Sequence, residues 1–246
     1  NKTDRNDCDA ILEAARCAGI HPVPVKSHEQ QQVQQLHGLR ETWKKTRTQR
    51  INLLRGILRE AGIEAPAATA AFIRAAHDLV DRPELARLSK MLHIVLAEIN
   101  LAEQCMAECE QQLKRWHQED AVVHKLDEVS GIGILTASAF KAAVGQPERF
   151  HNGRQLSAWL GMTPREFSSG NHRKLGRISC QGNTYVRTLL IHGARTSLLA
   201  AQRCQARTPE RLTALQRWAI QTAARIGHNK AAVALANKMV RICWAV

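Results

Sequence analysis

The stretch ELARLSKMLHIVLAEINLAEQCMAECEQQLKRWHQ, residues 84–118, decides most of the predicted fold. Its apolar residues recur in alternating steps of three and four, which is typical of one buried seam along a long helix. The seam residues are Leu85, Leu88, Leu92, Val95, Ile99, Ala102, Met106, Cys109, Leu113 and Trp116. A core helix could carry such a seam, but its regularity over this length favours a coiled coil.

A second long helix is predicted upstream of this seam. It begins at Ser27 and runs to about Glu60, where Gly62 and Pro66 break it. Two helices of about 34 residues would each span about 50 Å. We therefore expect residues 26–120 to form a coiled-coil connector, as a projecting antiparallel hairpin or as one arm of a homo-oligomer.

The remainder of the chain also favours helices, so the predicted fold class is mainly α. Further helices are expected over residues 1–20, 67–80, 183–203, 210–226 and 229–246, and no segment has a convincing strand pattern. The last of these helices carries a stripe that we assign to the core. It consists of Ala232, Leu235, Ala236, Met239 and Cys243.

Net charge is distributed unevenly along the 246 residues. The first 120 residues contain 17 Lys and Arg against 17 Asp and Glu, whereas residues 121–246 contain 18 against 5. All of the net charge of +13 thus lies in the C-terminal half. Such an asymmetry points to a polyanionic partner, of which DNA is the usual example, although a merely basic soluble surface is the alternative.

Cysteine usage and hydropathy indicate the compartment. The seven cysteines lack zinc-ligand spacing and are expected to be reduced thiols of a cytoplasmic protein. No signal peptide is visible and no apolar run reaches membrane length, so no membrane partner is expected.

The segment LGMTPREFSSGNHRKLGRISCQGNTYVR, residues 160–187, is the best candidate for chemistry. It combines many turn-forming residues with three serines and a dense set of cations. The cations are Arg165, Arg173, Lys174, Arg177 and Arg187. Arginine forks match phosphate oxygens, and a cation helps a hydroxyl to act as nucleophile, so this loop could bind and attack a phosphodiester. A basic loop that only holds nucleic acid is the more common case. Downstream, Arg187, Arg195 and Arg203 recur every eight residues and predict a basic ridge.

Two smaller motifs add to this interpretation. Gly131 and Gly133 lie between two short helical patterns, where free backbone N–H groups can hold a phosphate as in a helix-hairpin-helix; a plain helix connection is the alternative. Asp4 and Asp7 lie one turn apart on the first helix, where capping explains them, or where they are two ligands of Mg²⁺.

Several motifs together resemble a known family. They are KTDRND at residues 2–7, LDEVSGIGILTA at 126–137, QLSAWLGMTPRE at 155–166, SSG at 168–170, GRIS at 176–179 and HNKAAVALANKMVRICWAV at 228–246. In this order they resemble the insertion-sequence-110 type transposases, also called DEDD transposases or bridge-RNA-guided recombinases. The resemblance covers nearly the whole chain. It implies a RuvC-like nuclease domain ending within residues 1–25, a coiled-coil connector over 26–120 and a C-terminal transposase domain over 121–246.

The resemblance also implies site residues and partners. Asp4 and Asp7 match the last two acids of the DEDD tetrad and would bind Mg²⁺, and Ser169, directly before Gly170, matches the serine nucleophile. Ser168 and Ser179 remain alternatives. The partners would be DNA and a guide RNA, within an assembly near the bacterial nucleoid.

The activity of this chain alone is a separate question. In the family the first Asp and the Glu of the tetrad precede the KTD motif, so we expect this polypeptide to be inactive in strand cleavage by itself. Two other readings stay open. The chain is a non-catalytic DNA- or RNA-binding and oligomerisation fragment, or it caps full-length oligomers through the residue 85–116 seam.

Overall fold

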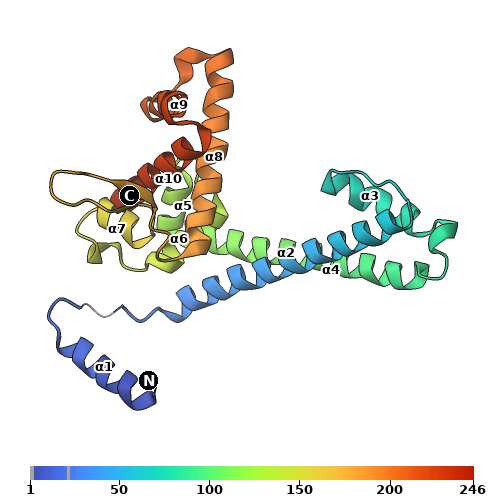
Figure 1. Ribbon diagram of the computed structural model, residues 1–246, viewed down its shortest axis with the longest axis horizontal. Coiled ribbons are helices and arrows are strands. Elements are labelled where there is room, and N and C mark those ends of the chain that lie inside the picture. Colours follow the sequence, from blue (N-terminus) through green and yellow to red (C-terminus); the bar gives the residue numbers. More distant parts are fainter. Residues whose placement is uncertain (1–2, 21–22) are drawn as a thin grey trace.

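The computed structural model of the chain describes residues 3–20 and 23–246, and the fold is mainly α-helical with one small β-hairpin. Asn1, Lys2, His21 and Pro22 lie outside the described residues, and so do the predicted helix start at residue 1 and the first residue of the KTDRND motif. Figure 1 shows an isolated N-terminal helix, a long two-helix arm and a helical body around an upright helix.

The arm is an antiparallel hairpin of two helices, α2 (His28–Glu60) and α4 (Ser89–Glu119). Three ion pairs between the helices show that they run antiparallel, because the residue number in α4 falls as the residue number in α2 rises. They join Arg40 to Glu110, Arg47 to Glu103 and Arg50 to Glu98. The predicted start of α2 at Ser27 is confirmed, because Ser27 caps this helix in a capping box with Gln30.

The predicted seam is the buried side of α4. Its buried members include Leu92, Ile99, Ala102, Cys109 and Leu113. Two details differ, because residues 83–85 form a short 3₁₀ turn (η1, Pro83–Leu85) and α4 begins only at Ser89. Leu88 therefore precedes the helix and is 46% exposed. Pairing with a second chain through this arm stays a prediction.

The tip of the arm has its own core. Helix α3 (Thr69–Val80) folds back on α2 and α4, and its Phe72 is fully buried against Leu54 and Leu58. The arm is joined to the body by Val33 and Leu113, which pack on Ala142 of helix α6 (Ile134–Val144). The arm and the body are therefore continuous at the start of α2 (Figure 1).

The body contains the remaining elements around one apolar core. They are α5 (Ala121–Asp127), α6 (Ile134–Val144), η2 (Pro147–Arg149), α7 (Gly153–Trp159), β1 (Pro164–Glu166), β2 (Leu175–Ile178), α8 (Thr184–Arg207), η3 (Pro209–Arg211), α9 (Ala214–Ile226) and α10 (His228–Ala245). The predicted core stripe of the last helix is confirmed, because all five of its residues are buried.

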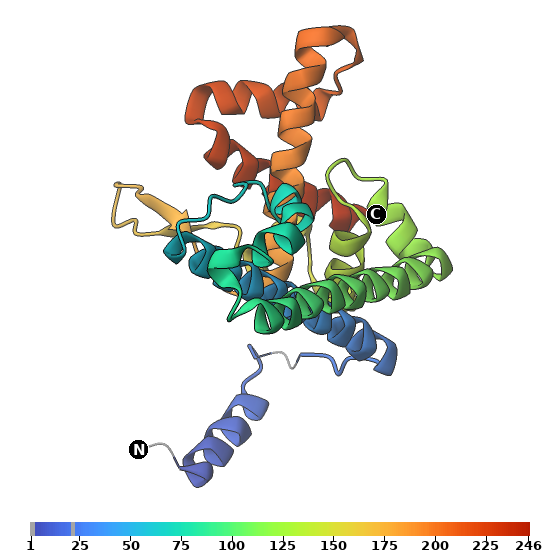
Figure 2. The same ribbon diagram turned by 90° about the vertical axis from the view of Figure 1, so that its right-hand side faces the viewer.

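The N-terminal helix α1 (Asp4–Arg16) differs from its prediction. It ends at Arg16 rather than near residue 20, and none of its described residues is buried: Ile11, for example, is 68% exposed. Figures 1 and 2 show α1 apart from the arm and the body. Within residues 3–20 and 23–246, no helix is long and apolar enough to cross a membrane.

Candidate nucleic-acid interface and catalytic hairpin

The predicted catalytic loop is a β-hairpin that projects from the body, seen in gold in Figure 2. Strands β1 and β2 pair antiparallel, with Pro164 opposite Ile178 and Glu166 opposite Leu175, and a register irregularity lies between. The expectation that the chain has no strand is therefore wrong. The strands are three and four residues long and almost wholly exposed, so no alternation of apolar residues marks them in the sequence.

The hairpin ends in a tight turn at Ser169. The N–H groups of Ser169 and His172 each donate to the other's carbonyl oxygen, at 3.2 and 3.1 Å. The two residues between them are Gly170, with φ of +55°, and Asn171. A glycine with positive φ at the first position of a two-residue loop fits the type II′ turn that hairpins favour. Ser169 thus lies at the exposed end of the hairpin.

The base of the hairpin is closed by two glycines. A Cβ on Gly161 would lie 1.9 Å from the Gln181 carbonyl oxygen, and a Cβ on Gly182 would lie 2.1 Å from that of Trp159. Both glycines also have positive φ, +71° and +82°. Only glycine allows the two legs of the hairpin to cross this closely.

Arg187 holds the same crossing together. Its Nη1 donates to the carbonyl oxygens of Leu160 and Gln181, at 3.1 and 3.0 Å, and its Nη2 donates to Thr184 Oγ1. The side chain is buried, at 7% exposed. This corrects two predictions: Arg187 positions the hairpin rather than facing nucleic acid, and the predicted ridge loses its first member because Arg187 is internal.

The three candidate serines have different surroundings. Ser168 Oγ is engaged, since it donates to Glu166 Oε1 at 2.7 Å and accepts from the Lys174 N–H at 3.1 Å. Ser179 is half-buried at the hairpin base, where its carbonyl oxygen accepts from Arg165. Ser169 Oγ makes no hydrogen bond to any described residue. Of the three, Ser169 is therefore the hydroxyl most available to an incoming phosphodiester.

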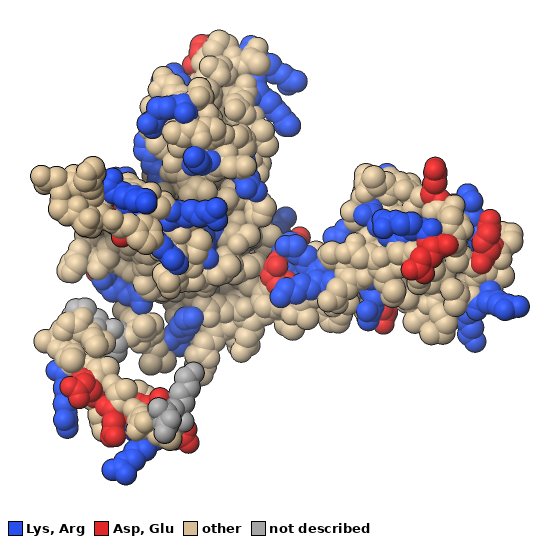
Figure 3. All heavy atoms as spheres, in the orientation of Figure 1, with Lys and Arg blue, Asp and Glu red and all other residues tan. Residues whose placement is uncertain are grey.

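Four of the predicted phosphate-binding cations lie along this hairpin and are exposed. They are Arg165, Arg173, Lys174 and Arg177. Arg173 approaches Glu166 at 3.5 Å, and Arg165 donates to the Ser179 carbonyl oxygen. Figure 3 shows mainly blue side chains over the body on this face, and both signs on α1 and at the tip of the arm. The charge asymmetry of the sequence thus becomes a basic face around the hairpin.

The glycine pair between α5 and α6 has two distinct roles. Gly131 packs on α8, where a Cβ would lie 2.7 Å from the Gly193 carbonyl oxygen, so it is needed for close helix packing. Gly133 precedes the first residue of α6, is exposed and has open space around it. The first N–H groups of a helix lack intrahelical partners, so a phosphate could be bound there. The phosphate contact at Gly133 stays a prediction. For Gly131 the structure adds a packing role that the sequence did not indicate.

The two predicted metal ligands lie far from completing a site. Asp4 and Asp7 are exposed in the first turn of α1, which Thr3 caps by accepting from the Asn6 N–H at 3.4 Å. Among residues 3–20 and 23–246, no group of three or more His, Cys, Asp and Glu side chains converges. Mg²⁺ is usually held by one or two protein carboxylates and several waters, so the pair is compatible with a hard cation, and Mg²⁺ binding at Asp4 and Asp7 stays a prediction.

Comparison with known proteins bears on what this arrangement does. A model of the family described as "Transposase IS116/IS110/IS902 family" matches residues 123–211. A Pseudomonas aeruginosa protein named "Probable family 20 transposase" is 40% identical over 250 residues, which cover 100% of this chain and 72% of that protein. The chain belongs to this transposase family.

Further relatives agree. The transposase of insertion sequence element IS1111A from Coxiella burnetii is 36% identical over 249 residues, covering 100% of this chain and 66% of that protein. The transposase of element IS1328 from Yersinia enterocolitica is 32% identical over 251 residues, covering 100% and 72%. This transposase chain thus spans about two thirds to three quarters of the length of these relatives. The family match itself covers α5 to η3, including the hairpin and its base.

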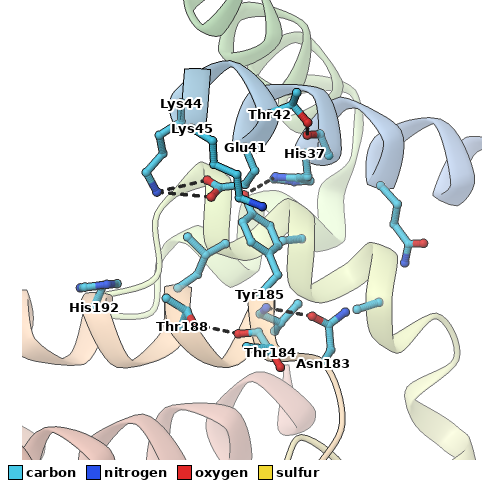
Figure 4. Close-up of a pocket in the computed structure, with 16 residues that line it drawn as sticks. His37, Glu41, Thr42, Lys44, Lys45, Asn183, Thr184, Tyr185, Thr188 and His192 are labelled. Carbon is cyan, nitrogen blue, oxygen red and sulfur yellow. Dashed lines mark hydrogen bonds and ion pairs between the residues drawn. The ribbon is translucent and has the colours of Figure 1, made fainter. Parts of the chain in front are cut away.

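A buried polar network of this transposase was missed by sequence reasoning (Figure 4). His37 of α2 lies between Tyr185 Oη and Ser138 Oγ, each 3.0 Å from a ring nitrogen. Ser138 Oγ donates its own hydrogen to the Ile134 carbonyl oxygen at 2.7 Å, so it accepts from His37 Nε2–H. Nδ1 is therefore unprotonated and accepts from the Tyr185 hydroxyl.

Burial fixes this protonation state. The pKa of His37 is lowered from 6.5 to about 4 by burial and then by the charge of Arg40, and burial raises the pKa of Tyr185 to about 12. The network ties α2, α6 and α8 together beside a cavity of about 630 Å³. Tyr185, which contacts His37 of the arm, and Arg187, which holds the hairpin base, both lie in the first turn of α8. The arm and the hairpin base are therefore joined through one helix end. Residues so far apart in sequence carry no local signal of this contact.

Proposed function

We propose that the chain is the DNA-handling part of an insertion-sequence transposase that cuts and rejoins DNA through Ser169. The observation that carries this is the place of Ser169: an exposed hydroxyl without a hydrogen-bond partner in the described chain, at the tip of a basic hairpin. The family membership of the chain supports the same reading.

The proposed step exchanges one phosphodiester for another. Ser169 Oγ attacks a DNA phosphorus, the Oγ–P bond forms and the bond to one strand oxygen breaks. The hydroxyl proton is lost from Oγ, and the departing strand oxygen takes up a proton and leaves as a free hydroxyl end. The phosphoserine link keeps the phosphate as a diester, so a second strand end can reverse the step without ATP.

The cations of the hairpin have a binding and charge-stabilising role. Arg165, Arg173 and Arg177 are placed to hold phosphate oxygens, because guanidinium groups match them bidentately. Arg187 acts indirectly, by keeping the two hairpin legs crossed so that the tip has a fixed direction. The face around Gly133 would hold the DNA backbone without reading its sequence.

Mg²⁺ belongs to this proposal through Asp4 and Asp7. When bound, the metal would supply charge stabilisation at the phosphoryl oxygens. The two carboxylates are one helical turn apart and exposed, so they fit a hard cation, and the other ligands would come from outside the described residues. A guide RNA that selects the DNA, and a homo-oligomer joined through the α2–α4 arm, complete the proposed assembly.

A second function is a nucleic-acid-binding and oligomerising module without chemistry. The incomplete acid set of the described residues favours it. Both readings predict affinity for DNA, but only the first predicts a covalent adduct.

The test is a covalent trap. Nicked DNA from the ends of the insertion sequence is incubated with Mg²⁺ and the chain fused to the N-terminal segment of a longer relative, which supplies further acids. A covalent adduct is expected that is lost in Ser169→Ala and kept in the neighbouring control Ser168→Ala. An adduct that persists in Ser169→Ala, or no adduct in any variant, contradicts the proposal.

A further inference from the structure

A second pocket lies at the base of the hairpin, where β1 and β2 meet α9 and α10. Its volume is about 500 Å³, within the range of small-molecule sites. The residues that line it are Met162, Pro164, Ile178, Trp218, Lys230, Val233, Ala234, Asn237, Lys238 and Arg241. We call it the hairpin-base pocket. Its lining holds three cations, an amide and an indole, but no carboxylate.

The cations of this pocket lie on one face of α10. Lys230, Lys238 and Arg241 are spaced by eight and three residues, which brings them to the same side of a helix. Without a nearby acid their charge is left uncompensated. Such a face favours an anionic ligand, most simply a phosphate.

The indole of Trp218 adds a flat surface. Trp218 is half-buried against the core, and Lys238 Nζ lies 4.2 Å from its ring centroid. A cation over an exposed ring contributes only about two- to fivefold, whereas stacking of an unpaired base contributes about 5- to 150-fold. A base therefore displaces the ammonium group, which can then move to the phosphate of the same nucleotide.

Asn237 supplies a polar group for the base edge. Its Nδ2 donates to the Met162 carbonyl oxygen at 3.1 Å, which fixes the amide orientation because that oxygen only accepts. Its Oδ1 makes no hydrogen bond to any residue in the described part of the chain, and it remains an acceptor for a base N–H. The pocket thus combines a stacking surface, one acceptor and several cations.

We propose that the hairpin-base pocket binds one unpaired nucleotide of a single strand that runs along the hairpin. A base inside a duplex is stacked on both faces, so only a base that has left its stack can reach Trp218. The proposal rests on the proposed function, because the same hairpin carries Ser169 at its tip. Pro164 at the pocket and Ser169 at the tip are five residues apart in an extended chain, which is about 17 Å.

The test measures binding and requires no cleavage. Fluorescence anisotropy with the full chain measures the Kd for four labelled probes, each about 12 nucleotides long. They are oligothymidylate, oligouridylate, an abasic strand of the same charge, and a duplex. Trp218→Ala is expected to weaken binding of at least one of the two base-bearing single strands about 5- to 150-fold, and to change binding of the abasic strand and the duplex less than about twofold. The strand that responds identifies the source as DNA, RNA or both.

Three comparisons control this result. Trp218→Phe keeps a stacking ring and should retain most of the affinity, whereas Arg225→Ala, on the same helix outside the pocket, should not change the preference for base-bearing strands. Should Trp218→Ala fail to fold, the unaltered chain still decides, because its Kd for the abasic strand must exceed that for the better base-bearing strand at least about fivefold. Equal affinity for abasic and base-bearing strands, or an equal loss on all four probes in Trp218→Ala, overturns the proposal.

The two proposals fail separately. Trp218-dependent binding without a Ser169 adduct refutes the catalytic function and leaves the pocket. A Ser169 adduct together with binding indifferent to Trp218 and to the presence of bases refutes the pocket alone.

Discussion

His37 makes the stability of this fold sensitive to mild acid. The ring is 4% exposed, and both nitrogens are occupied by Tyr185 and Ser138. Protonation of Nδ1 would place a donor against the Tyr185 hydroxyl hydrogen and a charge beside Arg40. Burial, followed by Arg40, accordingly lowers the pKa of His37 to about 4.

The sign and size of the effect follow from that value. The unfolded chain takes up this proton near pH 6.5 and the folded chain only near pH 4. The contribution of His37 to the free energy of unfolding is therefore fully present above pH 6.5 and is lost as the pH falls towards 4. Each pKa unit corresponds to about 1.4 kcal/mol. Between pH 7 and pH 4.5, His37 alone is expected to reduce the free energy of unfolding by about 2.5 kcal/mol.

Urea unfolding at pH 7.0, 5.5 and 4.5, followed by far-UV circular dichroism, measures this loss. His37→Gln retains one donor and one acceptor but does not titrate, so it should cost about 1 kcal/mol at pH 7 and be less sensitive to acid by about 2.5 kcal/mol than the unaltered chain. Other groups titrate in both proteins and cancel in the difference. His151→Gln, at an exposed position, should follow the unaltered chain. Parallel acid losses in the unaltered chain and His37→Gln would refute the reasoning.

The hairpin base gives two further predictions, both measured as changes in the free energy of unfolding. Gly161→Ala places a methyl group 1.9 Å from the Gln181 carbonyl oxygen at a φ of +71°, so we expect it to lower the free energy of unfolding by more than about 2 kcal/mol. The control Gly19→Ala, whose methyl group meets no atom within 4 Å, should lower it by under about 0.5 kcal/mol. Equal losses in the two variants would contradict the close crossing. In Arg187→Lys a single ammonium group takes the place of the guanidinium fork that donates to both hairpin legs, so we expect a loss of about 1–3 kcal/mol. Arg177→Lys, on the exposed strand, should have little effect. An unchanged free energy of unfolding in Arg187→Lys would show that the fork is not needed.

The parts of the fold that sequence predicts well are those with long local periodicity. The α4 seam follows from the spacing of Leu92, Ile99 and Leu113, and each of these residues is buried as expected. The helix start at Ser27 follows from local capping chemistry. Both signals lie within one element and need no knowledge of its partners.

The parts that sequence misses depend on contacts between distant segments. The hairpin strands are exposed and short, so their pairing is set by the glycine crossing below them and not by an apolar pattern. In the sequence, Arg187 cannot be told apart from the exposed arginines near it. Only the fold shows that its guanidinium group donates to the carbonyl oxygens of Leu160 and Gln181. His37 and Tyr185 are 148 residues apart, which hides their contact. The position of Ser169 beside Gly170 was indicated by the sequence, but its availability relative to Ser168 required the structure.

Ser169 Oγ is the proposed point of attachment to DNA, and mass spectrometry tests this most directly. The covalent complex is formed on nicked DNA by the chain fused to the N-terminal segment of a longer relative, and both components are then digested. A nucleotide mass is expected on the peptide at Ser169, and it should disappear in Ser169→Ala and persist in Ser168→Ala. A nucleotide on Ser168, on Ser179 or on any residue outside the hairpin, or full strand joining by Ser169→Ala, would contradict it.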